Sequence, residues 1–353
     1  MTLCHYSDIL KLAAQIAGLD YSMEVGASGL DVDAERQLRV AINTHLQMLW
    51  PKGKWPGITR CEQREFRATY GSGTTYQAGT FVFFPQTMAY YQAVRSGGFS
   101  GQAPADSSDV LNSAYWASAA TSFSGNDYSA SVAYVAGDII YYPTTDLYYQ
   151  CHTASTGNVP TNTTYWGALV PFDVYISYTQ TGETEIWEQG EIVVWDENPR
   201  ATTRAVEVPS FLSENGVQVN FALSPARPWV EYKVRVPNLA GEVWLTGSTY
   251  AVGDQVQFET ASGGVANINF YTCATATSAG ESPSSAAAKW TRVELPDLFK
   301  TYLGAKAAMS FLTGESDGRM AVAEAMADEA ESNLNDLLYR VQGQVPTTRI
   351  LTH

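Results

Sequence analysis

The spacing of apolar residues predicts helices at the beginning of the chain. Residues 8–17 carry apolar side chains at helical spacing, and Asp31 or Asp33 is placed to cap a second helix. Trp50 and Pro51 end that helix, because proline cannot continue it. The residues expected on its buried face are Leu38, Ile42, Leu46 and Leu49.

The same periodicity returns at the end of the chain. A third helix is predicted to begin at Pro296 and to end at Gly314, and a fourth to run from about residue 317 to residue 341. The fourth helix is expected to bury Met326, Leu334, Leu337, Leu338 and Val341. It is expected to turn Glu324, Asp328, Glu329, Glu331 and Asp336 toward water.

Between the helices one pattern is written three times, starting at Tyr76, Tyr134 and Tyr250. Each copy has a tyrosine, two residues, a glycine, a short strand, a second aromatic pair and, after a proline, a tryptophan. The glycine and the end of the pair are separated by twelve residues in two copies and by eighteen in the third. Residues 262–267 are therefore expected to form a lengthened hairpin loop.

Each copy is predicted to be a small antiparallel β module. A glycine before an alternating aromatic run marks a turn followed by a half-buried strand. A unit of about forty residues is close to the lower size limit for folding, so its aromatic residues are expected to supply most of its core.

A further β region lies between the second and third copies. Runs of residues alternate in polarity at period two, and Gly, Asn and Pro separate them. The expected strands are 172–178, 191–195, 204–208, 216–221 and 230–236. Strands this short and this closely spaced favour a β-sandwich or barrel.

Together these elements predict a multidomain α+β protein. Helices at the two ends of a chain most simply pack on each other, with all of the β-structure inserted between them. The expected parts are a helical core of residues 1–68 and 295–343, β repeats at 69–120, 126–169 and 244–294, a β-sandwich-like domain at 170–240, and an extended C-terminal arm at 344–353.

The charge of the chain argues against sequence-specific nucleic-acid binding. Hydrophobic residues make up 45% of the 353 residues, and the net charge is −15. Phosphate contacts need clustered Lys and Arg, whereas an acidic surface lets DNA pass without sticking. No stretch reaches the length of a membrane helix and no signal peptide is recognised, so synthesis in the cytoplasm and no membrane contact are expected.

Residues with catalytic potential stand in unsuitable contexts. Residues 314–318 match the G-x-S-x-G pattern of hydrolases but join two predicted helices, where a helix-to-helix turn is the simpler interpretation. The acids Glu183, Glu185, Glu188 and Glu191 lie on a predicted hairpin, where exposed acids are ordinary. We therefore expect no enzyme activity.

The cysteines and histidines do not have metal-site spacing, so no metal and no cofactor are expected. Cys151 and Cys273 occupy one position of the repeat, which Ala93 fills in the first copy. This position is expected to need a small buried group instead of a disulfide partner.

The order Tyr-x-x-Gly-Asp, aromatic strand, Tyr-Tyr, Pro, Trp resembles the small chitin-binding modules of carbohydrate-binding families 5 and 12. The resemblance implies glycan binding, but those modules follow the tyrosine strand with adjacent exposed aromatics. Here the matching positions are Ala93-Val94, Cys151-His152 and Cys273-Ala274. The residues left for stacking on a sugar are Tyr141, Tyr142 and Tyr148.

The terminal helices, with residues 39–50 followed by Gly53, Lys54, Trp55 and Pro56, resemble the neck and head-to-tail connector proteins of tailed bacteriophages. The resemblance implies an adaptor ring of a virion, commonly of twelve subunits, that binds the portal protein and a tail or stopper protein while genomic DNA passes through. In that arrangement Glu324, Asp328 and Glu331 would face the DNA channel. The arm residues expected to reach the portal or a neighbouring subunit are Gln344, Val345, Pro346, Thr347, Arg349, Ile350 and Leu351.

Two other functions stay open at this point. One is a glycan-binding fibre or receptor-binding component of a virion, which requires exposed tyrosines on one module face. The other is an enzyme acting on cell-wall polysaccharide, which requires paired acids such as Glu188 and Glu191 in a cleft.

Overall fold

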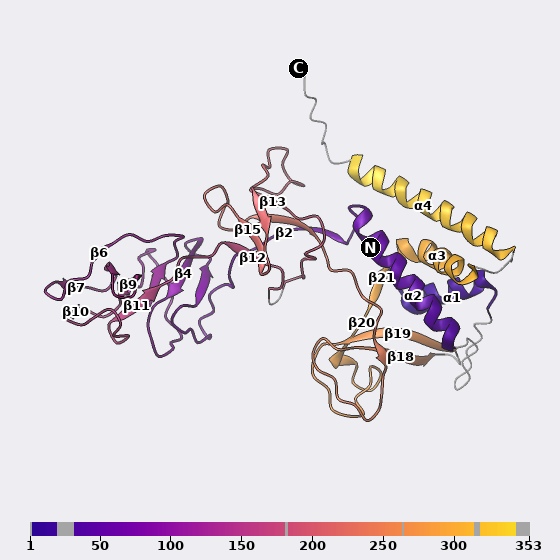
Figure 1. Ribbon diagram of the computed structural model, residues 1–353, viewed down its shortest axis with the longest axis horizontal. Coiled ribbons are helices and arrows are strands. Elements are labelled where there is room, and N and C mark those ends of the chain that lie inside the picture. Colours follow the sequence, from indigo (N-terminus) through magenta and orange to yellow (C-terminus); the bar gives the residue numbers. More distant parts are fainter. Residues whose placement is uncertain (1, 20–31, 181–182, 263–264, 314–317, 344–353) are drawn as a thin grey trace, which may run out of the picture. The chain divides into compact units, whose positions relative to one another are not determined.

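A computed structural model describes residues 2–19, 32–180, 183–262, 265–313 and 318–343. The fold class is α+β, as predicted, with helices from the two ends of the chain and small sheets between them (Figure 1). Internal contacts divide the chain into two units. Unit 1 comprises Met1–Thr59 and Arg235–His353, and unit 2 comprises Arg60–Val234.

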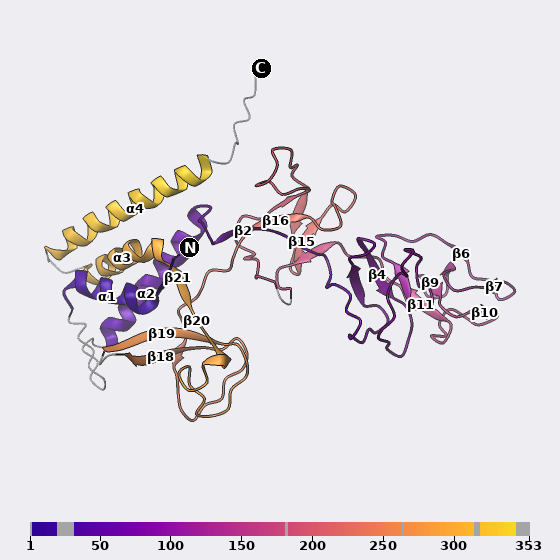
Figure 2. The ribbon, with the colours of Figure 1, turned by 180° about the vertical axis from the view of Figure 1, so that it is seen from behind.

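Unit 1 contains four α-helices in its described residues. They are α1 (Tyr6–Ala17), α2 (Val32–Leu49), α3 (Lys300–Leu312) and α4 (Arg319–Gly343), with short 3-10 helices at Trp50–Lys52 and Asp297–Phe299. Helix α3 contacts the other three, and both ribbon views place it between α4 and the pair α1 and α2 (Figure 2). Helix α3, which comes late in the sequence, is therefore the central helix of a four-helix bundle, and α1, α2 and α4 pack around it.

The buried faces of the early helices match the sequence pattern. Leu38, Ile42, Leu46 and Leu49 are all buried in α2. Gly18 ends α1 in the left-handed conformation, with a φ of 70° that favours glycine.

Helix α4 buries mainly small residues, whereas most of its larger apolar residues are only half-buried. Its buried stripe is Ala323, Ala327, Ala330 and Leu334, while Met326, Leu337 and Leu338 are half-buried. Alanines at this spacing let a neighbouring helix approach closely, and they do not stand out in a pattern of large apolar residues. The side chain of Val341 lies outside the described residues.

A two-stranded sheet joins the two ends of unit 1. Strand β1 (Leu3–His5) pairs antiparallel with β21 (Glu294–Pro296), directly before the turn that leads into α3. Nearby, Trp50 and Trp55 both pack edge-on against Phe299, at centroid distances of 6.1 and 5.2 Å. These contacts fix the residues after α2 to the residues before α3.

The three copies of the repeat are three small β modules. Module 1 contains β3 (Phe81–Phe84), β4 (Ala89–Ala93) and β5 (Trp116–Ser118). Module 2 contains β6 (Asn126–Asp127), β7 (Ala133–Tyr134), β8 (Ile139–Tyr142), β9 (Leu147–Cys151), β10 (Ser155–Thr156) and β11 (Trp166–Leu169). Module 3, in unit 1, contains β17 (Glu242–Val243), β18 (Gln255–Ser262), β19 (Val265–Cys273) and β20 (Trp290–Arg292).

Each module is built around the same cluster of five aromatic rings. The clusters are Tyr70, Tyr76, Phe84, Tyr91 and Trp116; Tyr128, Tyr134, Tyr142, Tyr149 and Trp166; and Trp244, Tyr250, Phe258, Tyr271 and Trp290. The tyrosine and tryptophan rings meet edge to face at 5.3, 5.1 and 5.4 Å in the three copies. This confirms that the repeated aromatics supply the module cores.

The hydrogen bonds of the cluster are repeated as well. The indole N–H groups of Trp116, Trp166 and Trp290 donate to backbone oxygens at 2.9, 3.0 and 3.2 Å. The turn glycines 79, 137 and 253 have φ values of 89°, 104° and 96°, which other residues rarely adopt. Their N–H groups donate to the carbonyl oxygens of Ala93, Cys151 and Cys273. This hydrogen bond holds the turn and the second hairpin strand together in each module.

The extra residues of module 3 lengthen its strands instead of its loop. Strands β18 and β19 stay paired out to Ser262 and Val265, so the loop expected over residues 262–267 does not span that range. Alternating Ile, Asn and Ala residues can extend the paired strands of a hairpin. The spacing of eighteen residues was therefore compatible with longer strands as well as with a longer loop.

The long hairpin of module 3 packs on the helices of unit 1. The ring of Phe270 meets Tyr6 of α1 edge to face at 5.0 Å. Glu35 of α2 is buried, and its Oε1 accepts hydrogen bonds from Tyr6 Oη (2.9 Å) and from Gln257 Nε2 (3.2 Å). Arg39 lies on the other side, with Nε 4.0 Å from Glu35 Oε2. One buried carboxylate thus connects α1, α2 and the module.

Apart from modules 1 and 2, unit 2 contains two three-stranded sheets around one core. Their strand orders are β12-β15-β14 and β13-β16-β2, with β2 at Thr59–Gln63, β12 at Tyr175–Ser177, β13 at Val193–Trp195, β14 at Ser210–Leu212, β15 at Gly216–Val219 and β16 at Trp229–Lys233. The strands are shorter than the pattern predicted, and within residues 204–208 only Glu207 forms an isolated bridge, with Trp195. Residues 60–68, which were expected in the helical core, belong to this unit because β2 pairs with β16.

Modules 1 and 2 contact each other through a reciprocal pair of glutamines. Gln92 and Gln150 occupy the same position of the repeat, and both are buried. Gln92 donates to Ala168 O (3.1 Å) and accepts from Val170 N (3.1 Å), and Gln150 donates to Trp116 O (2.9 Å). Each module therefore satisfies backbone groups of the other.

Gly167 of module 2 lies close to Val94 of module 1, and we predict that Gly167→Ala destabilises the chain. An added Cβ would lie 2.7 Å from Val94 Cβ and would overlap the Val94 carbonyl. The free energy of unfolding, measured in urea by tryptophan fluorescence, should fall by roughly 1–3 kcal/mol.

Gly73→Ala is the matched control, because an added Cβ there meets open space. It should leave the stability unchanged within about 1 kcal/mol. Equal urea midpoints for the two variants would contradict a tight contact between the modules.

Candidate functional site

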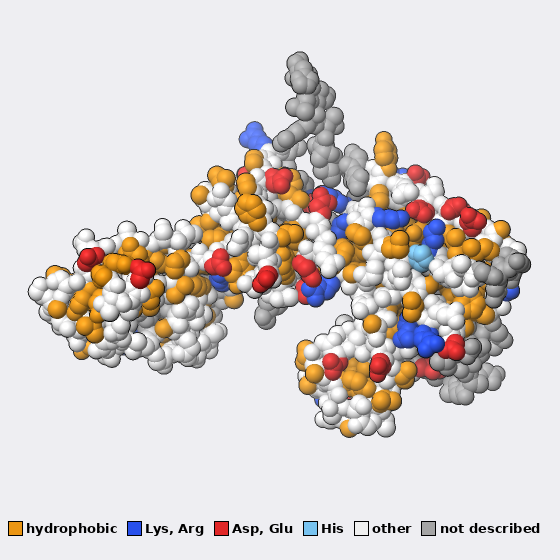
Figure 3. Space-filling view, viewed as in Figure 1, with side chains coloured by type: hydrophobic (Ala, Val, Ile, Leu, Met, Phe, Trp, Pro, Cys, Tyr) orange, Lys and Arg blue, Asp and Glu red, His pale blue; other side chains and the backbone are white. Residues whose placement is uncertain are grey.

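The acids of α4 do not form one uniform face. Glu324 and Asp328 are exposed, whereas Glu331 is half-buried and paired with two lysines of unit 1. Its Oε1 lies 3.1 Å from Lys52 Nζ and its Oε2 lies 3.9 Å from Lys306 Nζ. Figure 3 shows acidic side chains gathered over α4 with basic side chains beside them.

The bonds of Glu331 change its predicted role. It connects α4 to α3 and to the residues after α2, and this pair of lysines balances its charge. Of the three acids predicted to face a DNA channel, Glu324 and Asp328 remain on the solvent side of the helix.

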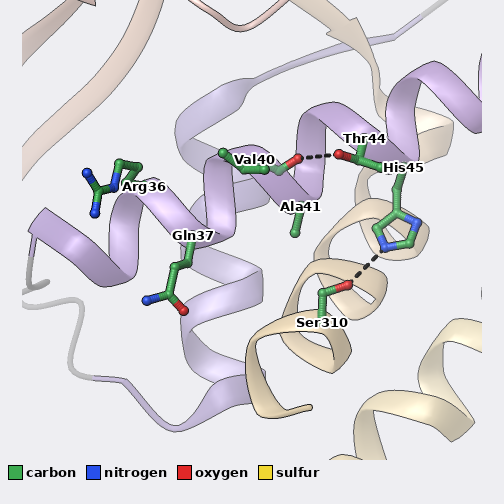
Figure 4. A pocket seen from close by; sticks show the side chains of 7 residues that line it. All are labelled: Arg36, Gln37, Val40, Ala41, Thr44, His45 and Ser310. Carbon is green, nitrogen blue, oxygen red and sulfur yellow. Dashed lines mark hydrogen bonds between the residues drawn. The ribbon is translucent and has the colours of Figure 1, made fainter. Parts of the chain in front are cut away.

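A shallow groove of about 430 Å³ lies between α2 and α3. Figure 4 shows the side chains of α2 along one side of it and Ser310 of α3 on the other. The groove is lined by Arg36, Gln37, Val40, Ala41, Thr44, His45 and Ser310. Val40 and, one turn beyond the lining, Met48 are exposed apolar residues on this side of α2.

His45 is the titratable group at the end of this groove. Its Nε2 lies 3.1 Å from Ser310 Oγ, within hydrogen-bond distance. Burial lowers the pKa of His45 below its ordinary value, and the positive charges of Lys306 and Lys52 lower it further. The imidazole of His45 is therefore neutral near pH 7. Lys306 and Lys52, which also bind Glu331, contribute to this protonation state of His45.

The three candidate sugar-stacking tyrosines lie on two different faces of module 2. Tyr142 belongs to the aromatic cluster, where its ring meets Tyr128 at 5.7 Å and Tyr149 at 6.2 Å. Tyr141 and Tyr148 form a cross-strand pair on the opposite face, with centroids 5.3 Å apart and planes tilted by 51°. The structure therefore brings together two of the three.

Of the acids considered for glycoside cleavage, Glu183 forms an ion pair inside unit 2. Glu183 Oε2 lies 3.4 Å from NH1 of Arg64, whose side chain is fully buried. Tyr178 has a raised pKa, caused first by burial and then by the charge of Glu188. Within the described ranges no group of three or more His, Cys, Asp and Glu residues is arranged to hold a metal ion.

The cysteines are all free, and the repeat position behaves as predicted. Cys151 and Cys273 are buried at equivalent places, and each Sγ lies 3.1 Å from the carbonyl oxygen two residues later. Burial raises the pKa of Cys151. In the part of the chain that the structure describes, no helix combines the length and the apolar character needed to cross a membrane.

Two predicted features lie outside the described residues. These are the C-terminal arm, residues 344–353, and residues 314–317 of the G-x-S-x-G pattern. Comparison of the chain with models of known protein families and with curated proteins finds no match, so its function is inferred from residues and geometry.

From the neutral state of His45 we predict a specific pH dependence of stability. Because the folded chain lowers the pKa of His45 from 6.5, the unfolded chain takes up that proton first as the pH falls. The stabilising contribution is present above about pH 6.5 and is lost below it.

The measurement is urea unfolding of the chain and of His45→Gln at pH 7.5 and pH 5.5. The wild-type chain should lose more stability than the variant, because glutamine can bond to Ser310 and does not titrate. A stability difference between the two that is the same at both pH values would contradict this assignment.

Proposed function

We propose that this chain is a structural subunit of the neck of a tailed bacteriophage, where it forms a head-to-tail adaptor ring that docks on the portal protein. One observation carries the proposal. The two ends of the chain build a single helical bundle, and all the β modules are inserted between them. A ring subunit of this design can pack through its helices and display its modules outside.

The pairing of β1 with β21 supports the helical part of this proposal. It brings residues such as Cys4 and Leu295 into register, so the bundle is closed from both ends of the chain. A bundle closed in this way can carry large insertions without a change in its own packing.

The charge of the chain supports a role beside DNA. Its net charge is −15, and the exposed acids Glu324 and Asp328 lie on one stripe of α4. Like charge disfavours contact with phosphates, so a channel lined in this way lets the genome slide. The proposed partners are further copies of this chain, commonly twelve to a ring, the portal and a tail or stopper protein, and the proposed location is the virion neck.

We predict that the native chain assembles into a closed ring, on its own or on the portal. Native mass spectrometry or light scattering of the purified chain, with and without a portal ring, should give a mass near twelve subunits. A monomer or trimer that ignores the portal would overturn the proposal and favour a glycan-binding fibre component.

We further predict that the C-terminal residues 344–353 anchor the subunit to the portal. A chain lacking them should keep its circular dichroism spectrum and lose cosedimentation with portal rings. The control replaces the segment by Gly and Ser residues of equal length, which should fail in the same way. Portal binding by either variant at wild-type strength would contradict an anchoring role.

A further inference from the structure

Each module has a second hairpin face, opposite its aromatic cluster, and the three copies can be compared directly. We call this the docking face. It is marked by one cross-strand pair in each module, at equivalent positions. The pairs are Phe83 and Tyr90, Tyr141 and Tyr148, and Gln257 and Phe270.

In modules 1 and 3 another part of the chain covers the docking face. Phe83 is 0% and Tyr90 4% exposed, because they form part of the core of unit 2. Phe270 is 0% and Gln257 9% exposed, against helices α1 and α2. The face is therefore a surface that the module uses to dock.

The covering segments share a chemical feature, because both bring an arginine over an aromatic ring of the face. The guanidinium of Arg227 lies 5.7 Å from the ring centroid of Phe83, and that of Arg39 lies 6.0 Å from the centroid of Phe270. Each arginine also lies near a glutamate, Arg227 at 3.2 Å from Glu65 of a distant segment and Arg39 at 4.0 Å from Glu35 of the same helix. Two independent segments thus place an arginine on this face, over the ring of the first hairpin strand in module 1 and over the ring of the second strand in module 3.

A polar contact accompanies the arginine in each case. Beside Arg227, the carbonyl oxygen of Ala226 accepts a hydrogen bond from Tyr90 Oη at 2.7 Å. In module 3, Gln257 donates to Glu35.

In module 2 the docking face is only partly covered by the rest of the chain. Module 1 contacts Ile139 and Tyr148 there, and both Tyr141 and Tyr148 keep part of their surface exposed. The two rings have nearly the same arrangement as Phe83 and Tyr90, with tilts of 51° and 45°. The geometry of a docking pair is therefore present without its full cover.

The charge around Tyr141 fits a cation. Residues 126–169 contain three Asp residues and neither Glu, Lys nor Arg. Tyr141 Oη donates to Asp146 Oδ1 at 2.6 Å, and Asp127 pairs with Tyr141 across the sheet. The pKa of Tyr141 is raised, first by its bond to Asp146, and Asp127 adds to the shift.

We propose that the docking face of module 2 binds an arginine-bearing segment of a partner protein, with the guanidinium over Tyr141 and beside Asp146 and Asp127. The covers of modules 1 and 3 define this chemistry, and the uncompensated aspartates favour it over a neutral ligand. The inference does not depend on ring formation or on the portal.

The probe is a fluorescein-labelled synthetic peptide with the sequence of residues 220–229, the segment that places Arg227 over Phe83. Its anisotropy is titrated with the full chain at low salt. Saturable binding is expected, and the same peptide with Arg227→Glu should bind at least about tenfold more weakly.

Variants of the protein locate the site. Tyr141→Ala and Asp146→Asn should each weaken binding by about tenfold, and asparagine tolerates the positive φ of 56° at position 146. Val135→Ser, at a residue of module 2 that is 60% exposed, is the matched control and should bind as the wild type. Circular dichroism of each variant checks folding.

Three outcomes overturn the proposal. They are no binding at millimolar concentration, equal binding of the Arg and Glu peptides, and binding that survives both Tyr141→Ala and Asp146→Asn. Binding of an N-acetylglucosamine tetramer that Tyr141→Ala abolishes, without any binding of the peptide, would assign the face to a glycan instead.

Discussion

The pairing of β1 with β21 is the constraint on which the rest of unit 1 depends. It joins residues 3–5 to residues 294–296, so the chain must leave unit 1 to form unit 2, residues 60–234, and then return. Helix α3 follows β21 after one short 3-10 helix, and it contacts α1, α2 and α4. Because the late helix is central, the early helices have no complete core until the chain has returned. Contacts this distant in sequence close slowly, and they make the bundle a product of the whole chain.

Each module is small, and its core is made mainly of aromatic rings. Five aromatic rings, an indole hydrogen bond and one turn glycine are repeated in all three, and they supply a core that about forty residues of aliphatic sequence would not. Because period two sends alternate residues to opposite faces, the strands that build this core also present a second face. That face changes between copies, and it determines what each module can pack against.

Sequence patterns predicted the parts of the fold that local spacing controls. Helix positions, the repeat and the buried face of α2 follow from residues close together in the chain. The first ring of each cluster, at Tyr70, Tyr128 and Trp244, was missed although it stands six residues before the repeat tyrosine every time. It lies outside a strand and varies between Tyr and Trp, so no alternation marks it. The partners of Glu331 and the covers of the docking faces come from distant segments, and no local pattern encodes them.

The docking face differs between the copies at one position in a way that fits what each module packs against. Gln92 and Gln150 bind backbone groups of the neighbouring module, and the third copy has Thr272 at that position. Module 3 packs on helices, whose backbone groups are already bonded to each other, so a long amide would have no open partner there. Its polar contact is instead made one strand away, where Gln257 replaces an aromatic residue and reaches the buried Glu35. The cluster stays constant while the second face follows the chemistry of its neighbour, and the aspartates beside Tyr141 indicate a cationic neighbour for module 2.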